Sequence, residues 1–143
     1  MKLLVLNGPN LNMLGIREKN LYGTETYDAL CERITEWARE YGAEAELRQS
    51  NHEGELVELI QSAYGVFDAI IINPAAYTHT SVAILDALKA VALPAVEVHL
   101  TDISAREPFR RISYAGMACE QHFIGLGFEG YREAIRWLTE RYG

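Results

Sequence analysis

Cysteine, lysine and long apolar runs are all scarce in this sequence of 143 residues. The two cysteines, Cys31 and Cys119, lie in no CxxC motif and in no Cys/His cluster. Disulfide scaffolds and structural zinc sites need several such residues at short spacing, so we expect neither. No apolar run approaches the roughly 20 residues that span a bilayer, and Asn7 interrupts the first apolar segment too early for a signal peptide. We expect a cytoplasmic protein that forms one domain over residues 1–143.

Lysine chemistry is not expected either. Lys2 precedes the first predicted strand, Lys19 lies in an open loop and Lys89 lies on a predicted helix. A Schiff-base lysine is a desolvated amine at a reaction centre, and none of these positions fits that description. The motifs GxxxxGKS/T and HExxH are also absent, which argues against a P-loop and against a zinc-protease type of metal site.

The net charge of −7 comes from one stretch of the chain. Residues 25–58 hold ten acidic residues and three arginines, whereas the rest of the sequence holds ten charges of each sign. Such a stretch is typical of solvated helix faces. It argues against a nucleic-acid partner, which requires a basic surface.

Apolar runs and helical periodicity alternate along the chain. Runs at 3–6, 43–47, 69–72, 95–100 and 122–124 predict strands, and apolar positions at helical spacing predict helices at 27–41, 56–63, 81–92 and 128–138. Strands that alternate with helices favour a doubly wound five-stranded parallel α/β sheet with helices on both faces. We expect the flavodoxin-like strand order 2-1-3-4-5, in which ligands bind beyond the carboxyl ends of the strands.

Glu97 and His99 lie at the end of the fourth predicted strand, where side chains at i and i+2 share one face. A carboxylate bonded to one ring nitrogen fixes the histidine tautomer and favours the protonated ring, so His99 is a candidate general acid. The alternative is a satisfied pair within the core. Two ionisable residues are costly to bury on an apolar strand, so we favour function.

The other predicted strand ends and loops carry further candidates. Asn73 and His79 face the expected crevice, although the Thr and Ser residues around them also suit helix capping. Arg106, Arg110 and Arg111 suggest an anionic or hydroxyl-rich ligand, with a solvated helix face as the alternative for Arg111.

The segment 11–24 is long enough to be a lid. It contains Arg17 and Tyr22, and an arginine beside a tyrosine stabilises its phenolate as a base. An ordinary surface loop with a packing tyrosine is the alternative.

The segment 125–130 matches GxGxxG, but no second strand–helix–strand half with an acidic residue follows it. We interpret its glycines as a tight turn and a close contact between helix and strand, and we expect no dinucleotide cofactor.

Several motifs occur in a characteristic order. They are Asn7-Gly8-Pro9-Asn10-Leu11-Asn12, the segment 15–23 ending in Tyr22-Gly23, Gln49-Ser50-Asn51-His52-Glu53-Gly54, the segment 73–81, Glu97-Val98-His99-Leu100, Arg106-Glu107-Pro108-Phe109-Arg110 and Gly125-Leu126-Gly127. Together they resemble the type II 3-dehydroquinate dehydratases of the shikimate pathway, which leads to aromatic amino acids. The resemblance covers nearly the whole chain.

The resemblance implies a hydro-lyase that converts 3-dehydroquinate to 3-dehydroshikimate without metal, cofactor or imine. Tyr22 would remove a proton from C2, assisted by Arg17. The enolate would be held by a water near Asn10. His99 would protonate the departing C1 hydroxyl while Glu97 orients the His99 ring.

The resemblance also implies the binding residues and the assembly. Asn73, His79 and Arg110 would bind ring hydroxyls, and the backbone amides of Leu100 and Thr101 would bind the substrate carboxylate. Members of the family form dodecamers of four trimers, in which Asp86 would reach the site of a neighbouring subunit.

The sequence departs from the family pattern at Lys19, in the expected lid, and at Asp102, beside the carboxylate site. We expect the added negative charge of Asp102 to weaken anion binding unless an arginine pairs with it. Two rival hypotheses remain at this point: a non-catalytic binding module on the same fold, and a flavin-binding electron carrier that rests on fold analogy alone.

Overall fold

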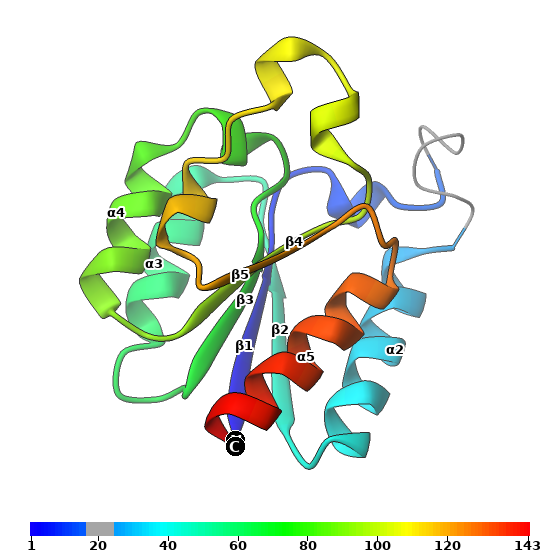
Figure 1. Ribbon diagram of the computed structural model, residues 1–143, viewed down its shortest axis with the longest axis vertical. Helices are drawn as coiled ribbons and strands as arrows, with labels where there is room; N and C mark the ends of the chain where they lie inside the picture. Colours follow the sequence, from blue (N-terminus) through cyan, green and yellow to red (C-terminus); the bar gives the residue numbers. More distant parts are fainter. Residues whose placement is uncertain (17–24) are drawn as a thin grey trace.

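A computed structural model describes residues 1–16 and 25–143 (Figure 1). Arg17, Lys19 and Tyr22 therefore lie outside the described residues, together with most of the predicted lid. The segment expected to be an open loop from residue 11 begins with a short 3-10 helix, η1 (Leu11–Met13). In the described part of the chain, every helix is too short or too polar to cross a membrane.

Five strands form one sheet, and all four pairings between neighbours are parallel. Their order is β2-β1-β3-β4-β5, so the predicted doubly wound order is confirmed. The strands are β1 (Lys2–Asn7), β2 (Glu44–Gln49), β3 (Ala69–Asn73), β4 (Ala95–His99) and β5 (Gln121–Ile124).

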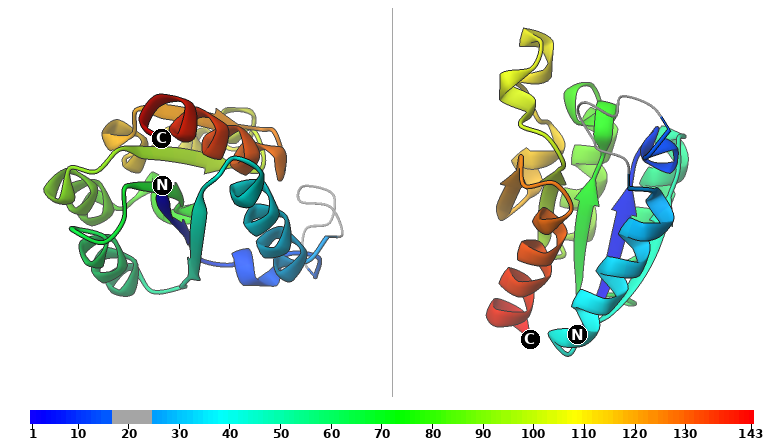
Figure 2. Two further views of the ribbon diagram at one scale, coloured as in Figure 1. Left: turned by 90° about the horizontal axis from the view of Figure 1, so that it is seen from below. Right: turned by 90° about the vertical axis from the view of Figure 1, so that its right-hand side faces the viewer.

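Helices cover both faces of the sheet because its central strands are apolar on both sides (Figures 1 and 2). On one face of the sheet, Leu3, Ile71 and Val98 pack against the first and the last α-helix. On the other face, Leu4 and Ile72 pack against the two middle α-helices. The helices are α2 (Tyr27–Glu40) and α5 (Glu129–Tyr142) on the first face, and α3 (Glu53–Ser62) and α4 (Val82–Val91) on the second.

The carboxyl ends of the strands carry the irregular segments of the described chain. Short 3-10 helices follow β3 and β4: η2 (Ala75–His79), η3 (Ile103–Ala105), η4 (Pro108–Arg110) and η5 (Ala115–Ala118). Figure 1 shows them gathered at the end of the sheet opposite the C-terminus. This is the edge at which the fold binds ligands.

The GxGxxG segment has the structural role predicted for its glycines. Gly125 and Gly127 have φ values of 81° and 60°, which a side chain rarely adopts. A Cβ on Gly130 would lie 3.1 Å from Cγ1 of Val98, so this glycine lets α5 pack closely on β4.

Gly8 is packed closely against the backbone at the carboxyl ends of the strands, and a substitution tests this contact. Its amide donates to the Asn73 carbonyl over 2.8 Å, and an added Cβ would lie 2.4 Å from the Pro74 carbonyl oxygen. Because that neighbour is backbone, we expect Gly8→Ala to lower the free energy of unfolding by about 2 kcal/mol or more. Urea unfolding measures the change.

Gly54→Ala is the matched control. Gly54 lies in α3 with nothing within 4 Å of an added Cβ, so the variant should be neutral or more stable by up to about 1 kcal/mol. Equal effects of the two substitutions would contradict the proposed clash.

Candidate active site

A pocket lies at the carboxyl ends of β1, β3 and β4. Residues from separate parts of the chain line it, and they include most of the positions selected from the sequence: Asn10, Asn73, His79, His99, Leu100, Thr101 and Arg110. Arg106 lines the pocket as well. The strand ends thus bring these residues together in one pocket.

Asn73 is held in place by a buried polar network at the base of the pocket. Its Nδ2 donates to the Tyr131 hydroxyl over 3.0 Å, and that hydroxyl donates to Oδ1 of Asn7 over 2.6 Å. Its Oδ1 accepts from the amide of Ala75 over 3.2 Å. The ends of β1 and β3, together with α5, thus hold the side-chain amide of Asn73 in the pocket.

Asn10 is held through its backbone. It has a left-handed conformation with φ 71°, which asparagine tolerates better than most residues. Its amide donates to Oδ1 of Asn51 over 3.0 Å, and Gln49 Nε2 donates to the same oxygen over 3.1 Å. The motif around residue 50 therefore positions the loop after β1.

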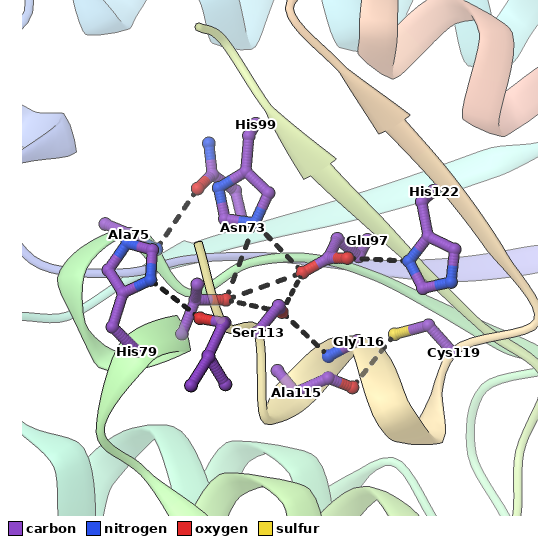
Figure 3. Close-up of polar contacts among 12 residues, drawn as sticks. Asn73, Ala75, His79, Glu97, His99, Ser113, Ala115, Gly116, Cys119 and His122 are labelled. Atoms are coloured by element: carbon purple, nitrogen blue, oxygen red, sulfur yellow. Dashed lines mark hydrogen bonds and ion pairs between the residues drawn. The ribbon is translucent and has the colours of Figure 1, made fainter. Parts of the chain in front are cut away.

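Glu97 and His99 form the buried ion pair that the strand spacing predicts (Figure 3). Nε2 of His99 lies 2.9 Å from Oε2 of Glu97, and the two side chains are only 5% and 2% exposed. A carboxylate accepts, so Nε2 carries the proton of this bond. Nδ1 of His99 is left to serve a ligand in the pocket.

The Glu97 carboxylate is surrounded by donors. Burial alone would raise its pKa, but the bonds from His99 and Ser113, the charge of His99 and the bond from His122 lower the pKa to about 2. Thr78 Oγ1 lies 3.5 Å from the same carboxylate oxygen as His99. Glu97 is therefore ionised throughout the physiological pH range.

His79 has a different environment. Its Nδ1 lies 2.8 Å from the Ile112 carbonyl, which only accepts, so Nδ1 carries a proton. Burial lowers the His79 pKa, and the neighbouring His99, Arg110 and Arg106 lower it further, against the opposing effect of the Ile112 bond. The ring is therefore neutral near pH 7, and its Nε2 accepts hydrogen bonds.

Two arginines give the pocket a positive side. Arg110 is positioned by a 2.6 Å bond from its Nε to Glu107 and lies over the Phe109 ring. Arg106 lines the same wall. Guanidinium groups of this kind bind carboxylates and hydroxyls.

Two other positions singled out from the sequence lie away from the pocket lining. Asp86 is exposed on α4. Asp102 caps η3, where its Oδ1 accepts from the amide and hydroxyl of Ser104 at 3.0 and 2.6 Å. These bonds lower the Asp102 pKa and direct the carboxylate to Ser104. Ser104 carries no charge, so these bonds orient the Asp102 carboxylate without neutralising it, and weaker anion binding beside Asp102 stays a prediction.

Sequence and structure comparisons agree on one family. The profile of the family described as "Dehydroquinase class II" matches residues 1–139. The chain belongs to this family. A 3-dehydroquinate dehydratase from Fusobacterium nucleatum is 53% identical over 99% of both chains.

Solved structures of type II dehydroquinases have the same fold. One from Butyrivibrio crossotus superposes with a TM-score of 0.95 at 49% identity and 97% coverage of both chains. One from Propionibacterium acnes gives 0.93 at 42% identity, covering 97% of this chain and 96% of the other. The family resemblance drawn from the motifs is confirmed, and with it the expectation that this dehydroquinase-family chain is an enzyme.

Four residues that support the pocket were not singled out as site residues from the sequence. They are Thr78, Ser113 and His122, which bond to Glu97, and Tyr131, which bonds to Asn73. Tyr131 is an ordinary core position by periodicity, and its hydroxyl gives no signal in the sequence. Within residues 1–16 and 25–143, no group of three metal-ligating side chains is assembled.

The ionised Glu97 makes a testable contribution to stability. Its pKa of about 2 in the folded chain lies below the ordinary value of 4.5, so its protonation favours the unfolded state. Unfolding free energy should fall by about 3 kcal/mol as the pH drops from about 4.5 to about 2. Glu97→Gln should remove most of this dependence.

Denaturant unfolding across this pH range measures the slope for each variant. Glu58→Gln, which removes an exposed carboxylate of α3, should retain the wild-type slope. A Glu97→Gln variant with an unchanged slope would show that another group titrates.

Proposed function

We propose that the chain dehydrates 3-dehydroquinate to 3-dehydroshikimate. The observation that carries this proposal is His99, which is paired with buried Glu97 and lines a pocket that also holds Asn73, His79 and two arginines. Membership of the dehydroquinase family, together with relatives named as 3-dehydroquinate dehydratases, supports this choice of substrate. The reaction belongs to the shikimate pathway.

The first step is removal of a proton. Tyr22, as a phenolate stabilised by Arg17, takes the proton from C2, beside the substrate ketone. The electron pair of the broken C–H bond forms an enolate. A water bound near Asn10 donates to the enolate oxygen, and the left-handed turn at Asn10 supports that position.

The second step is loss of water. The enolate collapses to a C1=C2 double bond as the C1–O bond breaks, and His99 gives its Nδ1 proton to the departing hydroxyl. Glu97 supports this role because a carboxylate on Nε2 stabilises the imidazolium before transfer. One proton is removed and one is donated, so the net change is loss of water and the step needs no oxidant or reductant.

Hydrogen bonds to the rest of the substrate orient its ring. Neutral His79 accepts from a ring hydroxyl through Nε2, and Asn73 and Arg110 bind further hydroxyls. The backbone amides of Leu100 and Thr101 lie beyond the end of β4 and bind the carboxylate.

We extend the proposal to the chain's organisation. Residues 1–143 form a single catalytic domain with a lid at about 11–24 that contains Arg17 and Tyr22. The functional assembly is a dodecamer of four trimers. In this proposed assembly Asp86, which is exposed on α4, reaches the pocket of a neighbouring subunit. The cytoplasmic location stays a prediction.

The decisive assay follows the ultraviolet absorbance of the conjugated enone product after purified protein is mixed with 3-dehydroquinate. Absorbance should grow without added metal or cofactor, and treatment with a chelator should leave the rate unchanged. Folded, assembled protein that gives no signal would favour a binding module instead.

Tyr22→Phe tests the proposed base. The variant should retain substrate binding, measured by calorimetry, while kcat falls by at least about 100-fold because no phenolate is available. Arg17→Ala should require a higher pH for the same fractional activity. Full activity of Tyr22→Phe would rule out Tyr22 as the base.

A further inference from the structure

The Glu97 carboxylate holds two histidines, one on each oxygen (Figure 3). His99 bonds to Oε2, and Nδ1 of His122 lies 2.6 Å from Oε1. His122 comes from β5, where it is the register partner of Glu97. Its side chain is 41% exposed, whereas that of His99 is 5% exposed. The buried Glu97–His99 pair is therefore bonded to a second imidazole, which is accessible to solvent.

The two carboxylate oxygens have different surroundings. Oε2 accepts from Ser113 as well as His99, with Thr78 at 3.5 Å. Among the described residues, His122 is the donor that holds Oε1. A carboxylate held from one side only can rotate about its last side-chain bond, which would change the direction from which it meets His99.

We propose that His122 is a positioning residue for the general acid: it fixes the Glu97 carboxylate from the solvent side and withdraws part of its charge from His99. The assignment of His99 as an acid rests on the proposed function. His122 is not among the residues that line the pocket, and we infer that its effect on the reaction passes through Glu97.

The hydrogen bond from His122 changes the negative charge that Glu97 presents to His99. A donor on Oε1 makes Glu97 a weaker partner for the His99 imidazolium, so His99 gives up its Nδ1 proton more readily. The groups that face Glu97 are His99 on β4, His122 on β5, Thr78 on η2, Ser113, and Cys119 after η5. Burial and the Glu97 charge raise the Cys119 pKa, so this thiol stays neutral and adds no competing charge.

Two substitutions separate this role from simple packing. His122→Ala removes the donor, and His122→Asn keeps a neutral donor because the Asn Nδ2 lies near the position of the histidine Nδ1. His122→Ala should lower kcat roughly tenfold with KM within about twofold. It should also move the pH-rate limb that requires protonated His99 upward by about half a unit or more.

His122→Asn should restore both the wild-type kcat, to within about threefold, and the position of the limb. The control is His52→Ala, an exposed histidine outside the site, which should match wild type. A His122→Ala variant with wild-type kcat and limb would overturn the proposal, as would a His122→Asn variant as impaired as His122→Ala.

A second measurement does not depend on turnover. The chain has four histidines, so nitrogen-15 NMR resolves each imidazole during a pH titration. The His99 midpoint should move upward in His122→Ala and stay in place in His52→Ala. If wild type fails to dehydrate 3-dehydroquinate, the proposed function fails, and this titration still decides whether His122 acts on His99. An unmoved His99 midpoint would refute that coupling.

Discussion

A negative charge buried at the end of β4 constrains the structure around it. Glu97 is 1% exposed, and an ionised carboxylate is tolerated in such a place only when donors surround it. The donors come from β4, β5, η2 and the segment after η4. Gly116 belongs to the same constraint, since a Cβ there would lie 2.6 Å from Oε1 of Glu97. The single negative charge of Glu97 thus constrains the positions of several loops.

A second polar network supports the opposite side of the pocket without a charge. Asn7, Tyr131 and Asn73 form a buried chain of hydrogen bonds between β1, α5 and β3. Breaking it would leave a buried amide unsatisfied, which costs about 1–3 kcal/mol. His99 and Asn73, which line the pocket, are therefore both held by groups outside its lining, so that their geometry is set without a ligand.

Structural features that depend on local sequence patterns could be predicted from the sequence. Apolar runs indicated the strands, and the i, i+2 spacing of Glu97 and His99 placed both on one face. The contacts of Ser113 and His122 had no such signal. His122 reaches Glu97 through the register of β4 against β5, and a single sequence does not specify register between strands separated by a long connection. Ser113 lies in an irregular segment whose path depends on the tertiary fold.

Two histidines in one pocket illustrate how partners divide chemical roles. His99 bonds to a carboxylate, which stabilises an imidazolium, whereas His79 bonds to the Ile112 carbonyl and lies beside two arginines that oppose a positive charge. In the proposed mechanism these partners make His99 the proton donor and His79 a neutral acceptor. Exchanging the partners would exchange the proposed roles, because a carboxylate favours a charged ring whereas a carbonyl beside two arginines favours a neutral one. The backbone that places Glu97 and Ile112 would thus decide which ring serves as the proposed acid.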